Sequence, residues 1–294
     1  MVPQLLWGLS LDGIKFPKGQ NGSHTGGVWE VEVRGQRYAY ADLELISPIF
    51  RAHEDDAHTW PEQVRAVLNA VTTGEFRSCV NITCGLHVHV GRGTTGFSTA
   101  EARQIAAAAT MLERCMDRLH PHDRWSNIYA YSLRSNHKIE DLSTRGAFDT
   151  IMETKSLNEL VDLLHKDRDF FTMPGKVNLF SLVDNPKTVE FRQHEGTLSL
   201  NQIQSWVRLV TNIVSSAVGM DKSELGRIAN GIQMLEEMEE AARKRGRKLP
   251  SKVNLDPLFN GFVHKDAHSL RSYYEDVATK YQDRNNLSAP SMGR

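Results

Sequence analysis

The sequence predicts an α+β protein, and three observations support this class. Segments with the alternating pattern of strands lie early and late in the chain, and segments with helical apolar spacing lie between and after them. No regular alternation of strand and helix appears, so a parallel α/β fold is not indicated. Without an internal repeat or a long linker, we expect residues 1–284 to form one domain and the polar residues 285–294 to form a flexible tail.

The strands are predicted from alternation and from β-branched or aromatic residues. Residues 12–27 are rich in Gly, Lys, Asn and Ser and favour a loop, and Arg34-Gly35-Gln36 favours a hairpin turn between the two strands that flank it. A second hairpin is expected at Asp184-Asn185-Pro186. The predicted strands comprise residues 28–33, 37–46, 79–90, 176–182 and 188–193.

The helices are predicted from apolar spacing and from capping residues. Ser98 with Glu101, and Ser156 with Glu159, each form the pattern of a capping box at a helix start. A stripe of apolar residues from Ile203 to Val218 recurs at helical spacing and defines one buried face. The predicted helices comprise residues 60–71, 99–119, 156–165, 203–218 and 223–245.

Composition and charge exclude several classes of function. The chain has 294 residues with 35 basic and 36 acidic side chains, so its formal charge of -1 offers no broad field for nucleic acid or an anionic membrane. Three cysteines without a CxxC pair indicate neither a disulfide framework nor a cysteine zinc site. The first residues lack the pattern of a signal peptide, and no apolar run has the length of a membrane span, so we expect a cytoplasmic protein.

Ionisable residues occupy every second position of three predicted strands. Since successive side chains of a strand point to opposite faces, each group shares one face while apolar residues share the other. A single charged strand face is usually a solvated surface, but three such strands together favour a site. The groups are Asp42 with Glu44, His87 with His89, and Glu190 with Arg192 and His194.

The acidic members of these groups point to a divalent metal. Carboxylates brought close together repel and raise each other's pKa unless a cation neutralises them. A concave cluster of Asp42, Glu44 and Glu190 with an imidazole is therefore the pattern of a metal site.

Four other sites fit parts of the sequence less well. Residues 91–96 read GRGTTG, which is literally GxGxxG, but no strand comes after the next helix to carry a ribose-binding acid. The HxH of residues 87–89 lacks the following glutamate of a cupin and the eight βα units of an amidohydrolase barrel. A Ser-His-Asp triad would need a GxSxG elbow, which the sequence does not contain.

Four segments in this order resemble the motifs of the amidoligase family, whose fold is similar to the catalytic domain of glutamine synthetase and glutamate-cysteine ligase. The resemblance extends over about residues 40–210, and Trp60-Pro61-Glu62 and Arg124-x-x-Asn127 support it. It implies a curved, mainly antiparallel sheet with helices packed on one face. The segments are LELISPIF (43–50), CGLHVHVG (84–91), KVNLFSL (176–182) and TVEFRQHEGTLS (188–199).

The resemblance also implies an activity, an ATP-dependent carboxylate-amine ligase that forms an acyl phosphate and uses Mg²⁺. The substrates would be small-molecule or peptide carboxylates and amines. The implied metal ligands are Glu44, His87 and Glu190; the implied substrate or nucleotide contacts are His89, Asn178, Arg124 and Arg192; and the implied catalytic residues are Glu190 and Arg192.

One departure from the family leaves alternatives open. The family normally begins with a glycine-valine-glutamate-x-glutamate strand that donates metal ligands, and no such segment is evident before Glu44, since residues 7–16 resemble the part of the family that comes after this strand. We expect that the strand either precedes the sequence or has been lost. If it has been lost, a non-catalytic binding protein becomes an alternative to the ligase, and a zinc-dependent hydrolase is a further one.

Overall fold

The computed structural model describes residues 6–11, 24–25, 28–33, 36–41, 44–51, 60–73, 78–81, 84–125, 130–165, 175–247 and 254–288. Between residues 6 and 41 and from residue 282 to 288 it describes the backbone alone. Asp42 and Asn127, both named by the sequence analysis, lie outside the described residues.

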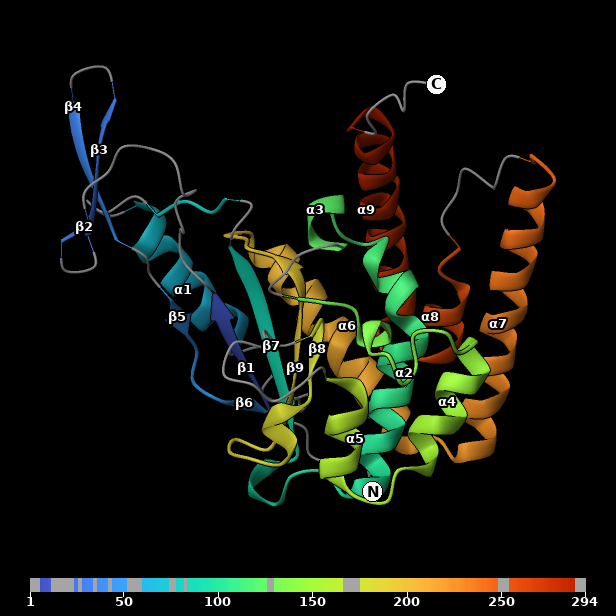
Figure 1. Ribbon diagram of the computed structural model, residues 1–294. Coiled ribbons are helices and arrows are strands. Elements are labelled where there is room, and N and C mark those ends of the chain that lie inside the picture. The colour runs from blue at the N-terminus through green and yellow to red at the C-terminus, as the bar shows by residue number, and fades with distance from the viewer. Residues whose placement is uncertain are drawn as a thin grey trace.

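The main sheet has the strand order β5-β1-β7-β9-β8, and β6 also pairs with β1 (Figure 1). Every strand pairing described in this sheet is antiparallel. The strands are β1 (Leu6–Leu11), β5 (Leu45–Ile46), β6 (Phe50–Arg51), β7 (Gly85–Gly91), β8 (Val177–Asn178) and β9 (Thr188–Glu195).

A separate three-stranded sheet contains the first predicted hairpin. It consists of β2 (His24–Thr25), β3 (Val28–Val33) and β4 (Gln36–Ala41), and the antiparallel pairing of β3 with β4 confirms the hairpin. The single strand predicted over residues 37–46 is wrong, because β4 belongs to this small sheet and β5 to the main one. Its uninterrupted alternation gives no sign of the change of sheet.

The five predicted helices are confirmed, with ends that differ by a few residues. Ser98 and Glu101 form the predicted capping box, and the side chain of Ser156 accepts a hydrogen bond from the Glu159 amide. The helices are α1 (Trp60–Thr73), α2 (Thr99–Asp117), α3 (His122–Trp125), α4 (Thr144–Glu153), α5 (Leu157–Leu164), α6 (Leu200–Gly219), α7 (Lys222–Lys244), α8 (Asp256–Gly261) and α9 (Ala267–Ser288), and the 3₁₀ helices are η2 (Gly93–Thr95), η3 (Leu133–Ser135) and η4 (Phe180–Leu182).

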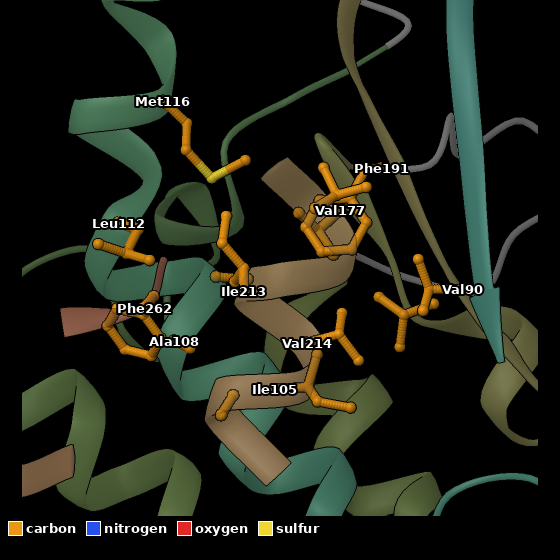
Figure 2. Packing of buried hydrophobic residues seen from close by; sticks show 14 of the residues in the cluster. Val90, Ile105, Ala108, Leu112, Met116, Val177, Phe191, Ile213, Val214 and Phe262 are labelled. Carbon is orange, nitrogen blue, oxygen red and sulfur yellow. The ribbon is translucent and has the colours of Figure 1, made fainter. Parts of the chain in front are cut away.

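The core lies between one face of the main sheet and the helices. Figure 2 shows α6 between the sheet and α2, with apolar side chains on both of its sides. The sheet contributes Val90, Val177 and Phe191, α6 contributes Ile213 and Val214, and α2 contributes Ile105, Ala108, Leu112 and Met116. The α+β class is confirmed, whereas the likeness to glutamine synthetase stays a prediction.

Two predicted strands are shorter than expected. The strand predicted over residues 79–90 begins only at Gly85. The strand predicted over residues 176–182 ends at Asn178, because the Asn178 side chain accepts a hydrogen bond of 2.9 Å from the Phe180 amide and the chain turns into η4.

Helix α9 extends to Ser288, past the predicted start of the tail at residue 285. Within the described part of the chain, no helix has the length and apolarity to cross a membrane.

Candidate active site

The predicted polar face forms on β7 and β9, and β8 adds Asn178 to it. Glu190 on β9 lies directly opposite His89 on β7 and Asn178 on β8. The apolar neighbours Val88 and Phe191 also pair with each other, and both are fully buried against the helices. Alternation therefore directs the polar side chains to the opposite face of the same three strands.

Glu190 is the centre of this face, which we call the Glu190 cluster and which comprises His87, His89, Asn178, Glu190 and Arg192. The Glu190 Oε1 atom lies 2.5 Å from Arg192 Nη1, 3.2 Å from His87 Nδ1 and 3.7 Å from His89 Nε2. Its Oε2 atom accepts a hydrogen bond of 2.6 Å from Asn178 Nδ2. Glu190 and His87 are each only 5% exposed, so these contacts are largely shielded from water.

The charges of the cluster determine its protonation. Burial alone would raise the pKa of Glu190, but the hydrogen bond with His87 and the positive charge of Arg192 together lower it well below its usual range. Burial lowers the pKa of His89 despite the opposing charge of Glu190. At neutral pH the cluster therefore contains an ionised Glu190 and a neutral His89.

His87 has one ring nitrogen that two partners share. Its Nδ1 atom lies 3.2 Å from Arg192 Nη1 and 3.2 Å from Glu190 Oε1. A guanidinium only donates hydrogen bonds and a carboxylate only accepts them. Without a proton, Nδ1 can therefore accept a hydrogen bond from Arg192, and with a proton it can donate one to Glu190. Binding of an ion or substrate to Arg192 or Glu190 would select one of the two states.

Asn178 holds the carboxylate of Glu190 in place. Its amide nitrogen donates to Glu190, and its amide oxygen accepts from the backbone of Phe180. Both contacts fix the orientation of the amide group, because a flipped amide would satisfy neither.

His165 holds the segment that carries Asn178. The Leu179 amide donates a hydrogen bond of 3.0 Å to His165 Nε2, so the ring proton is on Nδ1 and is donated to Tyr131 Oη at 2.9 Å. The ring also stacks on Phe180, with 4.3 Å between ring centroids. This residue was not singled out by the sequence analysis, and nothing in the local pattern distinguishes it from other histidines.

A bulge in β9 overturns the prediction for His194. Val88 pairs with Phe191 and Leu86 pairs with His194, so β9 has one more residue than β7 between these pairs. The extra residue interrupts the alternation, and His194 consequently faces the helices rather than the polar face. Its ring lies 5.4 Å from Trp206 of α6 between centroids.

Arg124 stabilises the backbone of this bulge. Its guanidinium is buried and donates to the carbonyl oxygens of Arg192 at 2.9 Å, His194 at 3.2 Å and Gln193 at 3.3 Å. These contacts make Arg124 a residue that positions Arg192. The role of Arg124 in substrate or nucleotide binding stays a prediction.

Glu44 lies beside β5, which is separated from β7 of the cluster by β1. It is exposed and immediately precedes β5. Its negative charge raises the pKa of His89, in opposition to burial, so the carboxylate lies within electrostatic reach of the cluster. Its role as a metal ligand stays a prediction.

Strand β1 was missed by the sequence analysis, although it lies beside β7 in the sheet. Its register places Gly8 opposite His89 and Ser10 opposite His87. Residues 6–11 thus form a strand that was not predicted, whereas the expectation that residues 7–16 come after the family's first strand stays a prediction.

The predicted metal site is only partly represented by the described residues. Among these, no group of three or more His, Cys, Asp or Glu side chains is arranged to hold a metal ion. Glu190 and His87 have donor atoms of suitable type, but the charge of Glu190 is compensated by Arg192. A divalent ion at Glu190 would require Arg192 to exchange this partner for another anion.

The sequence matches the model of a known protein family. A family model described as "putative amidoligase enzyme" matches residues 16–214. The chain belongs to this amidoligase family. The matched range includes β7, β8 and β9, and hence the whole Glu190 cluster of this amidoligase. No curated protein and no solved structure matches the chain. Membership of the family indicates an enzyme that forms amide bonds.

Proposed function

We propose that this amidoligase joins a carboxylate to an amine in an ATP-dependent reaction with an acyl phosphate intermediate. The observation that carries the proposal is the Glu190 cluster, in which an ionised carboxylate, an arginine and two imidazoles share one sheet face. A carboxylate does not react with an amine until one of its oxygens becomes a leaving group. Transfer of the γ-phosphoryl group of ATP to that oxygen meets this requirement.

Arg192 is the residue that would hold the anionic substrate. Its side chain is 14% exposed, against 7% for that of Glu190, so it lies at the accessible side of the cluster. A guanidinium binds carboxylate or phosphoryl oxygens with two parallel hydrogen bonds. Arg124 and the bulge hold the backbone from which Arg192 extends.

Glu190, His87 and Glu44 are the residues that would hold Mg²⁺. When bound, the ion would offset the charge that develops on the transferred phosphoryl group. Glu190 is ionised and needs no deprotonation before it coordinates. His89, neutral at the same pH, would donate a hydrogen bond to a phosphate oxygen or accept one from a protonated phosphate hydroxyl. A carboxylate that does not coordinate the ion would accept the proton that the attacking amine loses.

One observation favours a second function, that of a binding protein without catalysis. The carboxylate of Glu190 is already compensated by Arg192, whose Nη1 atom lies 2.5 Å from Glu190 Oε1. This ion pair weakens a metal site that depends on Glu190, because the ion would have to displace the guanidinium.

The test is amine-dependent release of ADP from ATP in the presence of Mg²⁺ and a panel of acids. Glu190→Gln keeps the shape but removes the charge, so ADP release should fall by several powers of ten while the melting temperature stays close to that of the wild type. Glu140→Gln, at an exposed position, serves as the control. Wild-type protein that releases no ADP with any pair of substrates would support the binding protein instead.

A further inference from the structure

We propose that Lys176 is a positioning residue for the Glu190 cluster, and that its side chain fixes the register of the edge strand β8. The register in turn determines where Asn178 and Arg192 lie. The proposal rests on the ligase function only in taking Arg192 as the group that holds the anionic substrate. The side chain of Lys176 acts through these two residues, since its ammonium group binds α2 rather than the cluster.

The ammonium group of Lys176 lies between two carboxylates of α2. Its Nζ atom lies 2.7 Å from Asp117 Oδ2 and 3.4 Å from Glu113 Oε1. The two acids are four residues apart, so they share one face of the helix. The side chain of Lys176 is 3% exposed, and those of both acids are also largely buried. We call these three residues the Lys176 triad.

Stability alone does not explain the triad. Burial raises the pKa of Asp117 to about 6, although the charge of Lys176 opposes this rise. A raised pKa means that the ionised carboxylate is less favourable in the folded protein than in the unfolded chain. Buried charges that add little stability have another attested role, which is to fix the register of one element against another.

The strand that follows Lys176 is too short to specify its own register. β8 has two residues at the edge of the main sheet (Figure 1), and the second of them, Asn178, pairs with Glu190. A shift by one residue would turn each side chain to the opposite face. Asn178 would then lose its hydrogen bond of 2.6 Å to Glu190. A side chain anchored on α2 opposes such a shift.

The backbone of Lys176 connects the triad to Arg192. Its carbonyl oxygen accepts a hydrogen bond of 2.8 Å from the Arg192 amide, and its own amide donates one of 2.8 Å to the Tyr131 carbonyl oxygen. Arg124 donates to the carbonyl oxygen of the same Arg192. Arg192 is thus held at its amide by Lys176 and at its carbonyl group by Arg124. A displacement of Lys176 therefore moves the backbone from which the guanidinium of Arg192 extends.

The side-chain amide of Asn178 reports the register in ¹H–¹⁵N spectra of the full chain. Its proton is donated to the ionised Glu190, so its chemical shift differs from that of an amide in water, and its absence from Asn178→Asp assigns the signal. Lys176→Met has a similar length without the charge, and we expect it to shift or broaden this signal. Arg103→Met removes another cation of α2, which donates to carbonyl oxygens at the end of α4, and should leave the signal unchanged.

A second variant keeps the test decisive if Lys176→Met does not fold. Two largely buried carboxylates without their shared cation are strongly destabilising. Lys176→Met combined with Glu113→Gln and Asp117→Asn removes all three charges, and the glutamine can still accept from the Leu133 amide as Glu113 does. We expect this neutral variant to fold and to show the same change of the Asn178 signal. A wild-type Asn178 signal in either folded variant overturns the proposal.

Kinetics separate this proposal from the ligase function. If the wild type releases ADP, we expect Lys176→Met to raise KM for the acid about tenfold, because Arg192 is displaced, and Arg103→Met to leave KM unchanged. A Lys176→Met protein with lower kcat and wild-type KM would have lost only folded protein, which overturns the proposal. ADP release from no pair of substrates refutes the ligase alone, since the Asn178 signal requires no turnover.

Discussion

Asn178 donates a hydrogen bond of 2.6 Å to Glu190, which lies directly opposite it on the neighbouring strand. This pair joins the edge strand β8 to the centre of the cluster. The bond is buried, and the same amide group also accepts from Phe180. Replacement of Asn178 therefore affects both the charge of the site and the turn beside it.

Asn178→Asp should destabilise the protein in a pH-dependent manner. It places a second carboxylate beside the ionised Glu190, and two buried like charges disfavour each other's ionised form. We expect a loss of about 1–3 kcal/mol in the free energy of unfolding at pH 8 and a smaller loss at pH 5, where the pair can share a proton. Urea unfolding at both pH values measures it, and an equal loss at both would contradict the argument.

Gly85→Ala should damage the site more than the fold. A Cβ atom at Gly85 would lie 2.7 Å from His87 Nε2, so the imidazole would have to move. We expect amine-dependent ADP release to fall about tenfold or more, with a small change in melting temperature. Gly231→Ala is the matched control, because nothing lies within 4 Å of its added Cβ and the helix should gain about 0.5–1 kcal/mol. Full activity of Gly85→Ala would show that the position of His87 does not matter.

The polar face could be predicted from sequence because it depends on a period of two residues. His87 and His89 share a face in any regular strand, as do Glu190 and Arg192, whatever the strands' neighbours. The bulge could not be predicted, because Gln193 is an ordinary strand residue and only the pairing with β7 reveals the extra residue.

The order of the strands in the sheet could not be predicted from the sequence either. β1 became recognisable only through its pairing with β7, since LWGLSL contains no β-branched residue and has a glycine in its interior. The break between β4 and β5 was hidden for the opposite reason, because alternation continues across it. Local patterns thus predicted which polar side chains share a face, whereas long-range pairing decides what surrounds them.

Mg-ATP should raise the melting temperature, and NADH should not. The GRGTTG segment lies between β7 and α2, but in the described sheet β7 pairs with antiparallel neighbours on both sides. A dinucleotide site needs a parallel βαβ unit. A ligand that binds only the folded state adds RT ln(1 + [L]/Kd) to its stability, which differential scanning fluorimetry detects. A shift with NADH and none with Mg-ATP would refute the proposed nucleotide site.

Ser10→Glu should strengthen Mg²⁺ binding. The register places residue 10 of β1 directly opposite His87 of β7, whose Nδ1 atom lies 3.2 Å from Glu190. An added carboxylate contributes both charge and an oxygen ligand, so we expect Mg²⁺ affinity by calorimetry to rise severalfold. Ser10→Gln has the same length without the charge and should leave the affinity unchanged. Equal affinity in all three proteins would remove residue 10 from the metal site.

The stability of the protein should fall as the pH decreases from about 6.5 to about 4, and His165 should account for part of the fall. Burial lowers the pKa of His165 from 6.5 to about 4, and it lowers the pKa of His194 to about 4 as well. In this pH window the unfolded chain binds protons that the folded protein excludes. The stabilisation by neutral His165 is therefore fully present above pH 6.5 and is lost as the pH falls toward 4.

His165→Gln should flatten this dependence. The glutamine amide can accept from the Leu179 backbone and donate to Tyr131, as the imidazole does, but it does not titrate. The pKa change of His165 corresponds to on the order of 3 kcal/mol between pH 7 and pH 4, so the variant should lose that much less stability than the wild type over this range. His137→Gln, at an exposed histidine, should retain the wild-type dependence. Chemical unfolding at several pH values measures the free energy of unfolding of each protein. If this free energy changes with pH by the same amount in the wild type and in His165→Gln, His165 is not held neutral by its surroundings.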